Sequence, residues 1–174
     1  FLFRTANPSR ANRWFGRLQL FSSGFMSFSH GANDAQNAMG IITAALFTGG
    51  FIKEFEVPFW VILLCAIVIG IGTAVGGWRV VRTLGQRIYH LKTVHGFTAE
   101  TTAALVLIGA THLGIPISTT HVITSAIVGA GSSKKISAVR WGVAFNIVFA
   151  WLATIPACAL MGGFFSFVFK HIFQ

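Results

Sequence analysis

A cluster of amide and carboxyl side chains lies inside an otherwise apolar part of the sequence. Residues 30–40 read HGANDAQNAMG and include Asn33, Asp34 and Asn37. An Asp at the centre of a bilayer costs roughly 2.5–3.5 kcal/mol on insertion scales, so acids inside membranes usually have a binding function. The alternative is that these side chains only cap a helix and hydrogen-bond to neighbouring helices. Because a single Ser or Asn would cap the helix at lower cost, the cluster favours a binding site.

Hydroxyl side chains form a second polar group, directly after a proline. Ser118, Thr119, Thr120 and His121 follow Pro116 at the expected start of a helical arm. A helix N-terminus carries unpaired N–H groups and the positive end of the dipole, so it attracts anions, and hydroxyls add donors. Ser or Thr at an N-cap is also ordinary helix chemistry. Since opposed half-helix ends recur at transporter binding sites, the two groups together predict an anion site.

Acidic residues near an anion site indicate a coupling cation. Asp34 would repel an anion, so a cation or a proton is expected between them, with carbonyl oxygens near His30 and Gly31 as further ligands. Glu100 is a second candidate, although a Glu in the first turn of a helix is also favourable against the dipole, and a straight helix would place it ~20 Å from Ser118. His30 and Asp34 also have the i, i+4 spacing of a metal pair, which leaves a metal-dependent hydrolase open.

The composition is that of an integral membrane protein. Of the 174 residues, 54% are hydrophobic and only 10% are charged, against roughly 25% charged in soluble domains. Residues 59–77 and 141–163 each reach the ~20 apolar residues that cross a bilayer. The net charge of +9 comes from basic residues between apolar segments, so we expect no nucleic-acid partner. Cys65 and Cys158 lie inside apolar spans and are interpreted as packing residues.

The positions of Lys and Arg predict the orientation of the chain. By the positive-inside rule, the basic arm 1–17 and the loops 78–95 and 132–140 face the cytoplasm, which makes the protein multi-pass. Residues 78–92 are basic and amphipathic, which predicts a helix in the membrane interface.

Two apolar segments are interrupted in ways that predict broken structure. Residues 98–131 begin and end on the same side and are divided near Gly114, leaving arms of about 16 residues, or ~24 Å. Such arms are too short to cross, so a re-entrant helical hairpin is predicted. Residues 18–48 are predicted to form a discontinuous transmembrane helix whose halves meet at 31–34. The fold class is therefore an all-α integral membrane protein.

The two polar motifs resemble the signatures of the inorganic phosphate transporter (PiT) family. Gly31 to Asp34, with Asn37-Ala38 and Gly40, is similar to the GANDxxNAxG signature, and residues 114–121 are similar to the PxSTTH tip of the family's re-entrant hairpin. The resemblance implies two inverted repeats that meet around a phosphate flanked by cations. Phosphate-binding roles are then implied for these residues: Asn33, Asn37, Ser118, Thr119, Thr120 and, as an accessory, His121. Asp34 and Glu100 are implied to serve the coupling cation.

The resemblance also implies an activity and partners. The expected function is inorganic phosphate transport coupled to H⁺ or Na⁺ in a bacterial inner membrane, without enzymatic activity or another cofactor. Ala35-Gln36 within the first motif leaves the coupling ion open. One copy of each motif indicates the C-terminal half of a longer transporter, so an N-terminal repeat in cis or in trans is an expected partner, and a homodimer is possible. A sulfate or other tetrahedral oxyanion permease is the alternative within transport.

Overall fold

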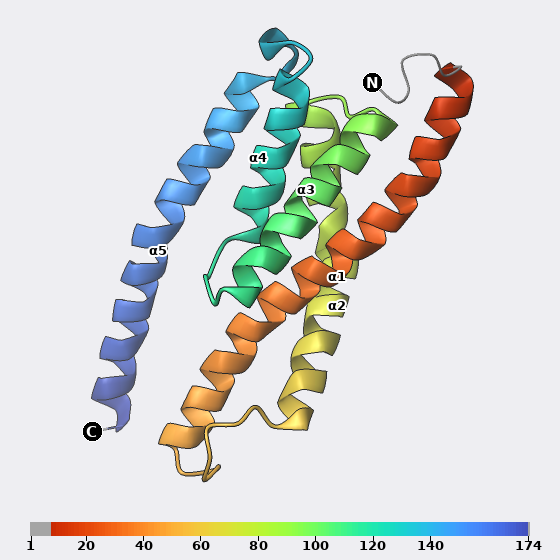
Figure 1. Cartoon of the computed structure of the whole chain (residues 1–174). Coiled ribbons are helices and arrows are strands. Elements are labelled where there is room, and N and C mark those ends of the chain that lie inside the picture. Colours follow the sequence, from red (N-terminus) through yellow and green to blue (C-terminus); the bar gives the residue numbers. More distant parts are fainter. Residues whose placement is uncertain (1–7, 174) are drawn as a thin grey trace. The chain divides into compact units, whose positions relative to one another are not determined.

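The computed structural model describes residues 8–173, and every regular element in that range is helical (Figure 1). The elements are α1 Pro8–Thr48, α2 Phe59–Arg82, the π-helical turn η1 Thr83–Ile88, α3 Thr93–His112, α4 Thr119–Ser132, the 3₁₀ turn η2 Ile136–Ala138 and α5 Trp141–Phe173. The predicted all-α class is confirmed.

The chain divides into two compact units, residues 1–139 and residues 140–174. The second unit consists of α5, a single apolar helix that contains Pro156. Two stretches have the length and composition to cross a membrane, Phe59–Ile88 and Trp141–Ile172. The predicted spans 59–77 and 141–163 fall within them, and both helices run further than the predicted spans.

Helix α3 forms the centre of the first unit, where it packs along α1 on one side and against α4 on the other. Its buried positions carry small residues, Ala99, Ala103 and Ala104, together with Leu107. Small side chains let helix backbones approach closely, which is how helices associate where there is no water to exclude. This close packing fixes the register of α3 against α1, and the site depends on that register.

The predicted break in residues 18–48 is wrong, because α1 is one continuous helix from Pro8 to Thr48. Gly31 lowers helix stability by only about 1 kcal/mol relative to Ala, which packing overrides. Asn33 would end a helix only if its side chain bonded to the local backbone, but its amide is used by the hairpin instead. The helix also includes residues 8–17, so no separate arm precedes it there, while residues 1–7 lie outside the described part.

The predicted hairpin is present as two helices joined by a short turn, although α3 begins earlier than predicted, at Thr93. The turn contains Gly114 at a φ of +66°, a conformation that glycine adopts without steric cost. The N-cap of α4 is Ser118, whose hydroxyl accepts a hydrogen bond from the N–H of His121 at 3.4 Å. With 14 residues, α4 is only ~21 Å long and too short to cross a bilayer. A re-entrant position in the membrane stays a prediction.

The predicted interfacial helix at 78–92 is wrong as a separate element. Helix α2 continues to Arg82, widens into η1 and stops at Ile88, after which the chain is extended at Tyr89. Gly76 and Gly77 precede the amphipathic pattern, but the chain stays helical through both of them, so these glycines do not end the helix here. The change in pattern marks a change of surroundings along one helix.

Candidate functional site

The first motif contacts the tip of the hairpin through Asn33, which is only 6% exposed. Its side-chain amide donates a hydrogen bond to the carbonyl oxygen of Ile117 at 3.2 Å. Its side-chain oxygen accepts a hydrogen bond from the hydroxyl of Thr111 at 3.4 Å. One buried amide therefore joins the middle of α1 both to the end of α3 and to the turn before α4.

Asp34 lies beside the start of α4. The hydroxyl of Thr119, in the first turn of α4, donates to the Oδ2 atom of Asp34 at 3.5 Å, and the Nδ1 atom of His30 lies 3.6 Å from the same oxygen. These contacts are long, and 38% of the Asp34 side chain is exposed. The positive end of a helix dipole is a favourable place for a carboxylate. Asp34 is thus positioned by weak contacts and stays accessible to a small solute.

Not every predicted site residue joins this cluster. Asn37 and Thr120 are exposed, and within the described part of the chain no hydrogen bond ties either of them to Asn33 or Asp34. Ser118 is exposed and caps α4, and His121 follows in the same turn. The start of α4 therefore places Thr120 and His121 next to the cluster in sequence.

Sequence reasoning missed two members of the cluster, Thr111 and the carbonyl of Ile117. Thr111 comes shortly before Gly114, and its place at the end of the first arm is the signal that would have indicated it. A backbone carbonyl in a turn carries no sequence signal. The predicted use of carbonyl oxygens near His30 and Gly31 is wrong, because α1 is continuous there and those carbonyls lie within its helical ladder.

Glu100 belongs to a different cluster. The hydroxyl of Ser22 donates to its Oε2 atom at 2.6 Å, and the same hydroxyl lies 3.0 Å from the carbonyl oxygen of Gln19. Ser22 precedes Asn33 on α1 by ~17 Å of helix, and Glu100 precedes Thr111 on α3 by a similar rise. The two predicted cation residues, Asp34 and Glu100, are therefore well separated along the helix pair.

Gln19 reaches the Glu100 cluster across a glycine. Its side-chain amide lies where a Cβ atom of Gly96 would be, so a larger residue at that position of α3 would displace the end of the Gln19 side chain. A cavity of about 250 Å³ adjoins Glu100, with Ser23 and Ser27 of α1 in its otherwise mainly apolar wall. The Glu100 carboxyl group is therefore half-enclosed, with one strong hydrogen bond from α1.

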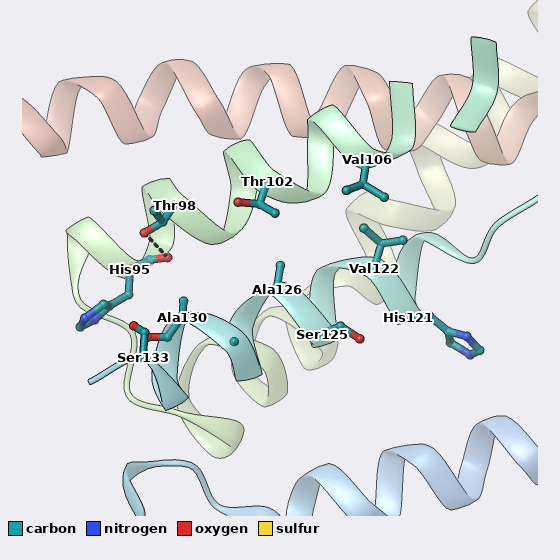
Figure 2. Close-up of a pocket in the computed structure, with 11 residues that line it drawn as sticks. His95, Thr98, Thr102, Val106, His121, Val122, Ser125, Ala126, Ala130 and Ser133 are labelled. Atoms are coloured by element: carbon teal, nitrogen blue, oxygen red, sulfur yellow. Dashed lines mark hydrogen bonds between the residues drawn. The ribbon is translucent and has the colours of Figure 1, made fainter. Parts of the chain in front are cut away.

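Two further cavities lie beside the predicted motifs. Figure 2 shows a cavity of about 690 Å³ between α3 and α4, with Thr98 and Thr102 from α3 facing Ala126 and Ala130 from α4. His121 lies at one end of it, and neither Asn33 nor Asp34 lines it. A second cavity, of about 510 Å³, separates residues 30–32 of α1 from α2. The first motif thus has one face toward the hairpin and another toward α2.

The described residues offer little for a resident metal ion. Within residues 8–173, no three His, Cys, Asp or Glu side chains come together as a metal site would require. His30 and Asp34 form a pair without a third such ligand in that range.

Comparisons with known proteins agree on one family. A sequence model of the phosphate transporter family matches residues 3–162. A probable low-affinity inorganic phosphate transporter of Rhizobium meliloti is 50% identical over 161 residues, which are 92% of this chain and 48% of that protein. A protein of the same name from Bacillus subtilis is 39% identical over 173 residues, 99% of this chain and 52% of its own length. The chain spans about half the length of these relatives.

A solved structure is similar to this chain in fold as well as in sequence. The chain superposes on a structure entitled the sodium-dependent phosphate transporter with a TM-score of 0.76 and 37% identity. The match covers 88% of this chain and 39% of that one.

Proposed function

This chain belongs to the phosphate transporter family, and from that premise we propose that it forms one half of a transporter that moves inorganic phosphate together with H⁺ or Na⁺. The observation that carries the proposal is the contact between the two motifs. Asn33 bonds to Ile117 and Thr111, and Asp34 contacts Thr119, so a carboxylate lies directly at the start of α4.

Phosphate would bind at the start of α4. The N–H groups of Thr119 and Thr120 and the hydroxyls of Ser118 and Thr120 would supply donors for its oxygens. The hydroxyl of Thr119 would turn from Asp34 to the phosphate, while the N–H of His121 donates to Ser118. Asn33 and Asn37 would approach from α1, and His121 would be an accessory donor. The same donors fit sulfate, so the uptake experiment below distinguishes phosphate from sulfate as the substrate.

A cation is needed because Asp34 has the same sign as the substrate. Two unit charges 4 Å apart repel by about 4 kcal/mol at an effective dielectric constant of 20. That repulsion would weaken phosphate binding by nearly a thousandfold. A proton or Na⁺ on Asp34 removes it, so each ligand strengthens the binding of the other, which is the thermodynamic basis of coupled transport.

Glu100 would serve as a second, separate cation position. Its distance along the helices from Asp34 means that one ion does not bind both carboxylates. Its hydrogen bond from Ser22 and its adjoining cavity support a small bound cation or proton there.

The proposed protein is a multi-pass membrane protein of a bacterial inner membrane. The two candidate spans bury few of their apolar side chains within the chain, as expected when lipid or further helices cover them. The N-terminal repeat, in cis or in trans, would complete the site from the opposite side, and a homodimer is compatible with the exposed apolar helices.

Uptake of labelled phosphate in a transport-deficient host, with the complete gene product, tests the proposal. Asp34→Asn is expected to abolish most phosphate uptake, because an amide neither binds the cation nor carries the proton. Glu54→Gln is the matched control, since it removes an exposed loop carboxylate and should leave uptake unchanged. Loss of uptake on replacing Na⁺ by choline would assign Na⁺, and loss with a protonophore would assign H⁺. Uptake of sulfate alone, or full phosphate uptake by Asp34→Asn, would contradict the proposal.

A further inference from the structure

A basic cavity of about 410 Å³ lies where α2 ends and the chain turns back. Its wall includes Trp78, Arg82, Gln86 and His90. Trp78, Arg82 and Gln86 follow one another at intervals of four residues, so they share one face along the end of α2 and η1. None of these residues belongs to the two clusters described above.

The local backbone conformation shapes this cavity. The chain becomes extended at Tyr89 and folds back, so that the N–H of Leu91 donates to the carbonyl oxygen of Gly85 at 3.3 Å. His90 and Leu91 thereby line the cavity together with the helix face. Gly85 lines the cavity, and the space next to it is open, because a Cβ atom there would meet nothing within 4 Å. π-Helical turns are rare and often occur at functional sites.

The charge of this region is entirely positive. No acidic residue occurs between Glu56 and Glu100, whereas residues 79–92 include three arginines and a lysine. In the described part of the chain, the Arg82 guanidinium has neither an ion-pair partner nor a hydrogen-bond acceptor. A guanidinium binds phosphate through two parallel hydrogen bonds. The cavity therefore suits an anion that carries a phosphate group.

The position along α2 indicates which phosphate reaches it. Starting at Phe59, a helix crosses the ~30 Å hydrocarbon core in about 20 residues, which places the boundary near Trp78. Tryptophan is enriched at that boundary, and Arg82 lies ~6 Å beyond it, at the level of the lipid headgroups. We propose that this cavity binds the phosphate of an anionic phospholipid headgroup, with Arg82 as its partner. The proposal does not depend on phosphate transport.

Native mass spectrometry of the complete gene product tests the proposal by titration with phosphatidylglycerol and with phosphatidylethanolamine. Phosphatidylglycerol is expected to bind more tightly, and Arg82→Gln is expected to weaken its binding about fivefold. Gly85→Leu should also reduce it, because the side chain fills the hollow without changing the charge. Arg79→Gln is the matched control, since it removes an exposed arginine that does not line the cavity, and it should retain the lipid.

Four results would overturn the proposal. An equal loss in Arg79→Gln and Arg82→Gln would mean that only overall charge attracts the lipid. Equal binding of the two lipids would remove the role of the anionic headgroup. Displacement of phosphatidylglycerol by millimolar inorganic phosphate would assign the cavity to free phosphate. If Arg82→Gln fails to fold, Gly85→Leu decides, and unchanged phosphatidylglycerol binding by that variant counts against the cavity.

Discussion

Asn33 is expected to hold the hairpin against α1, and Asn33→Ala measures how strongly it does so. The substitution removes a buried donor to Ile117 and a buried acceptor from Thr111, so a carbonyl and a hydroxyl lose their partners. An unpaired buried polar group costs about 1–3 kcal/mol, while interhelical hydrogen bonds in membrane proteins average about 0.6 kcal/mol. With two bonds broken, we expect a loss of about 1–3 kcal/mol in the free energy of unfolding. One kcal/mol lowers Tm by about 2–4 °C in a domain of 150–250 residues and by less in a longer protein, so a fall of a few degrees is expected.

The assay is thermal unfolding of the purified complete protein in one detergent, with Asn37→Ala as the control. Asn37 follows Asn33 by four residues, is exposed, and has no hydrogen-bond partner among the described residues, so its removal should leave Tm within experimental error. Both variants are expected to lower phosphate uptake. The reasoning about the hairpin is refuted if the two variants melt at the same temperature, because burial and bonding would then make no difference.

Two other substitutions test the second cluster and the packing beside it. Ser22→Ala removes the 2.6 Å hydrogen bond to Glu100 and should reduce phosphate uptake several-fold. Ser22→Thr keeps the hydroxyl and should retain most of the uptake. Equal uptake by the two variants would exclude a role for the bond. Gly96→Ala places a methyl group against the Gln19 amide and should lower stability by about 1 kcal/mol in thermal unfolding, at the low end of overpacking costs, because the Gln19 side chain can move. Gly109→Ala, where a Cβ atom meets nothing within 4 Å, should instead be neutral or stabilising, and a loss equal to that of Gly96→Ala would contradict the packing argument.

The hairpin was predictable because its signals are local. Gly114 supplies a positive φ, Pro116 prevents continuation of the helix, and Ser118 caps the next one, so the three residues specify a turn without reference to the rest of the fold. The position of the turn needed no tertiary information.

The continuity of α1 was not predictable for the opposite reason. An Asn inside an apolar segment satisfies its amide either by capping its own helix or by bonding to another helix, and the sequence is the same in both cases. Asn33 bonds to Ile117, which lies 84 residues away in the chain. The hydrogen-bond partner of Glu100 is equally remote in the sequence, since Ser22 is 78 residues away. Only the register of α1 against α3 brings the two residues together.

The continuity of α1 changes what a coupling ion can bind. In a broken helix, free carbonyl oxygens at the break would supply most ligands, but here the helical ladder uses the carbonyls near Gly31. The remaining oxygens of this cluster are side chains and one turn carbonyl: Asp34, Asn33, Thr111, Thr119 and Ile117. A proton needs only the Asp34 carboxylate, whereas Na⁺ needs several oxygens, and the Asn33 and Ile117 oxygens already accept hydrogen bonds. Na⁺ coupling at Asp34 therefore requires ligands from the phosphate itself or from the other half of the transporter, while proton coupling does not.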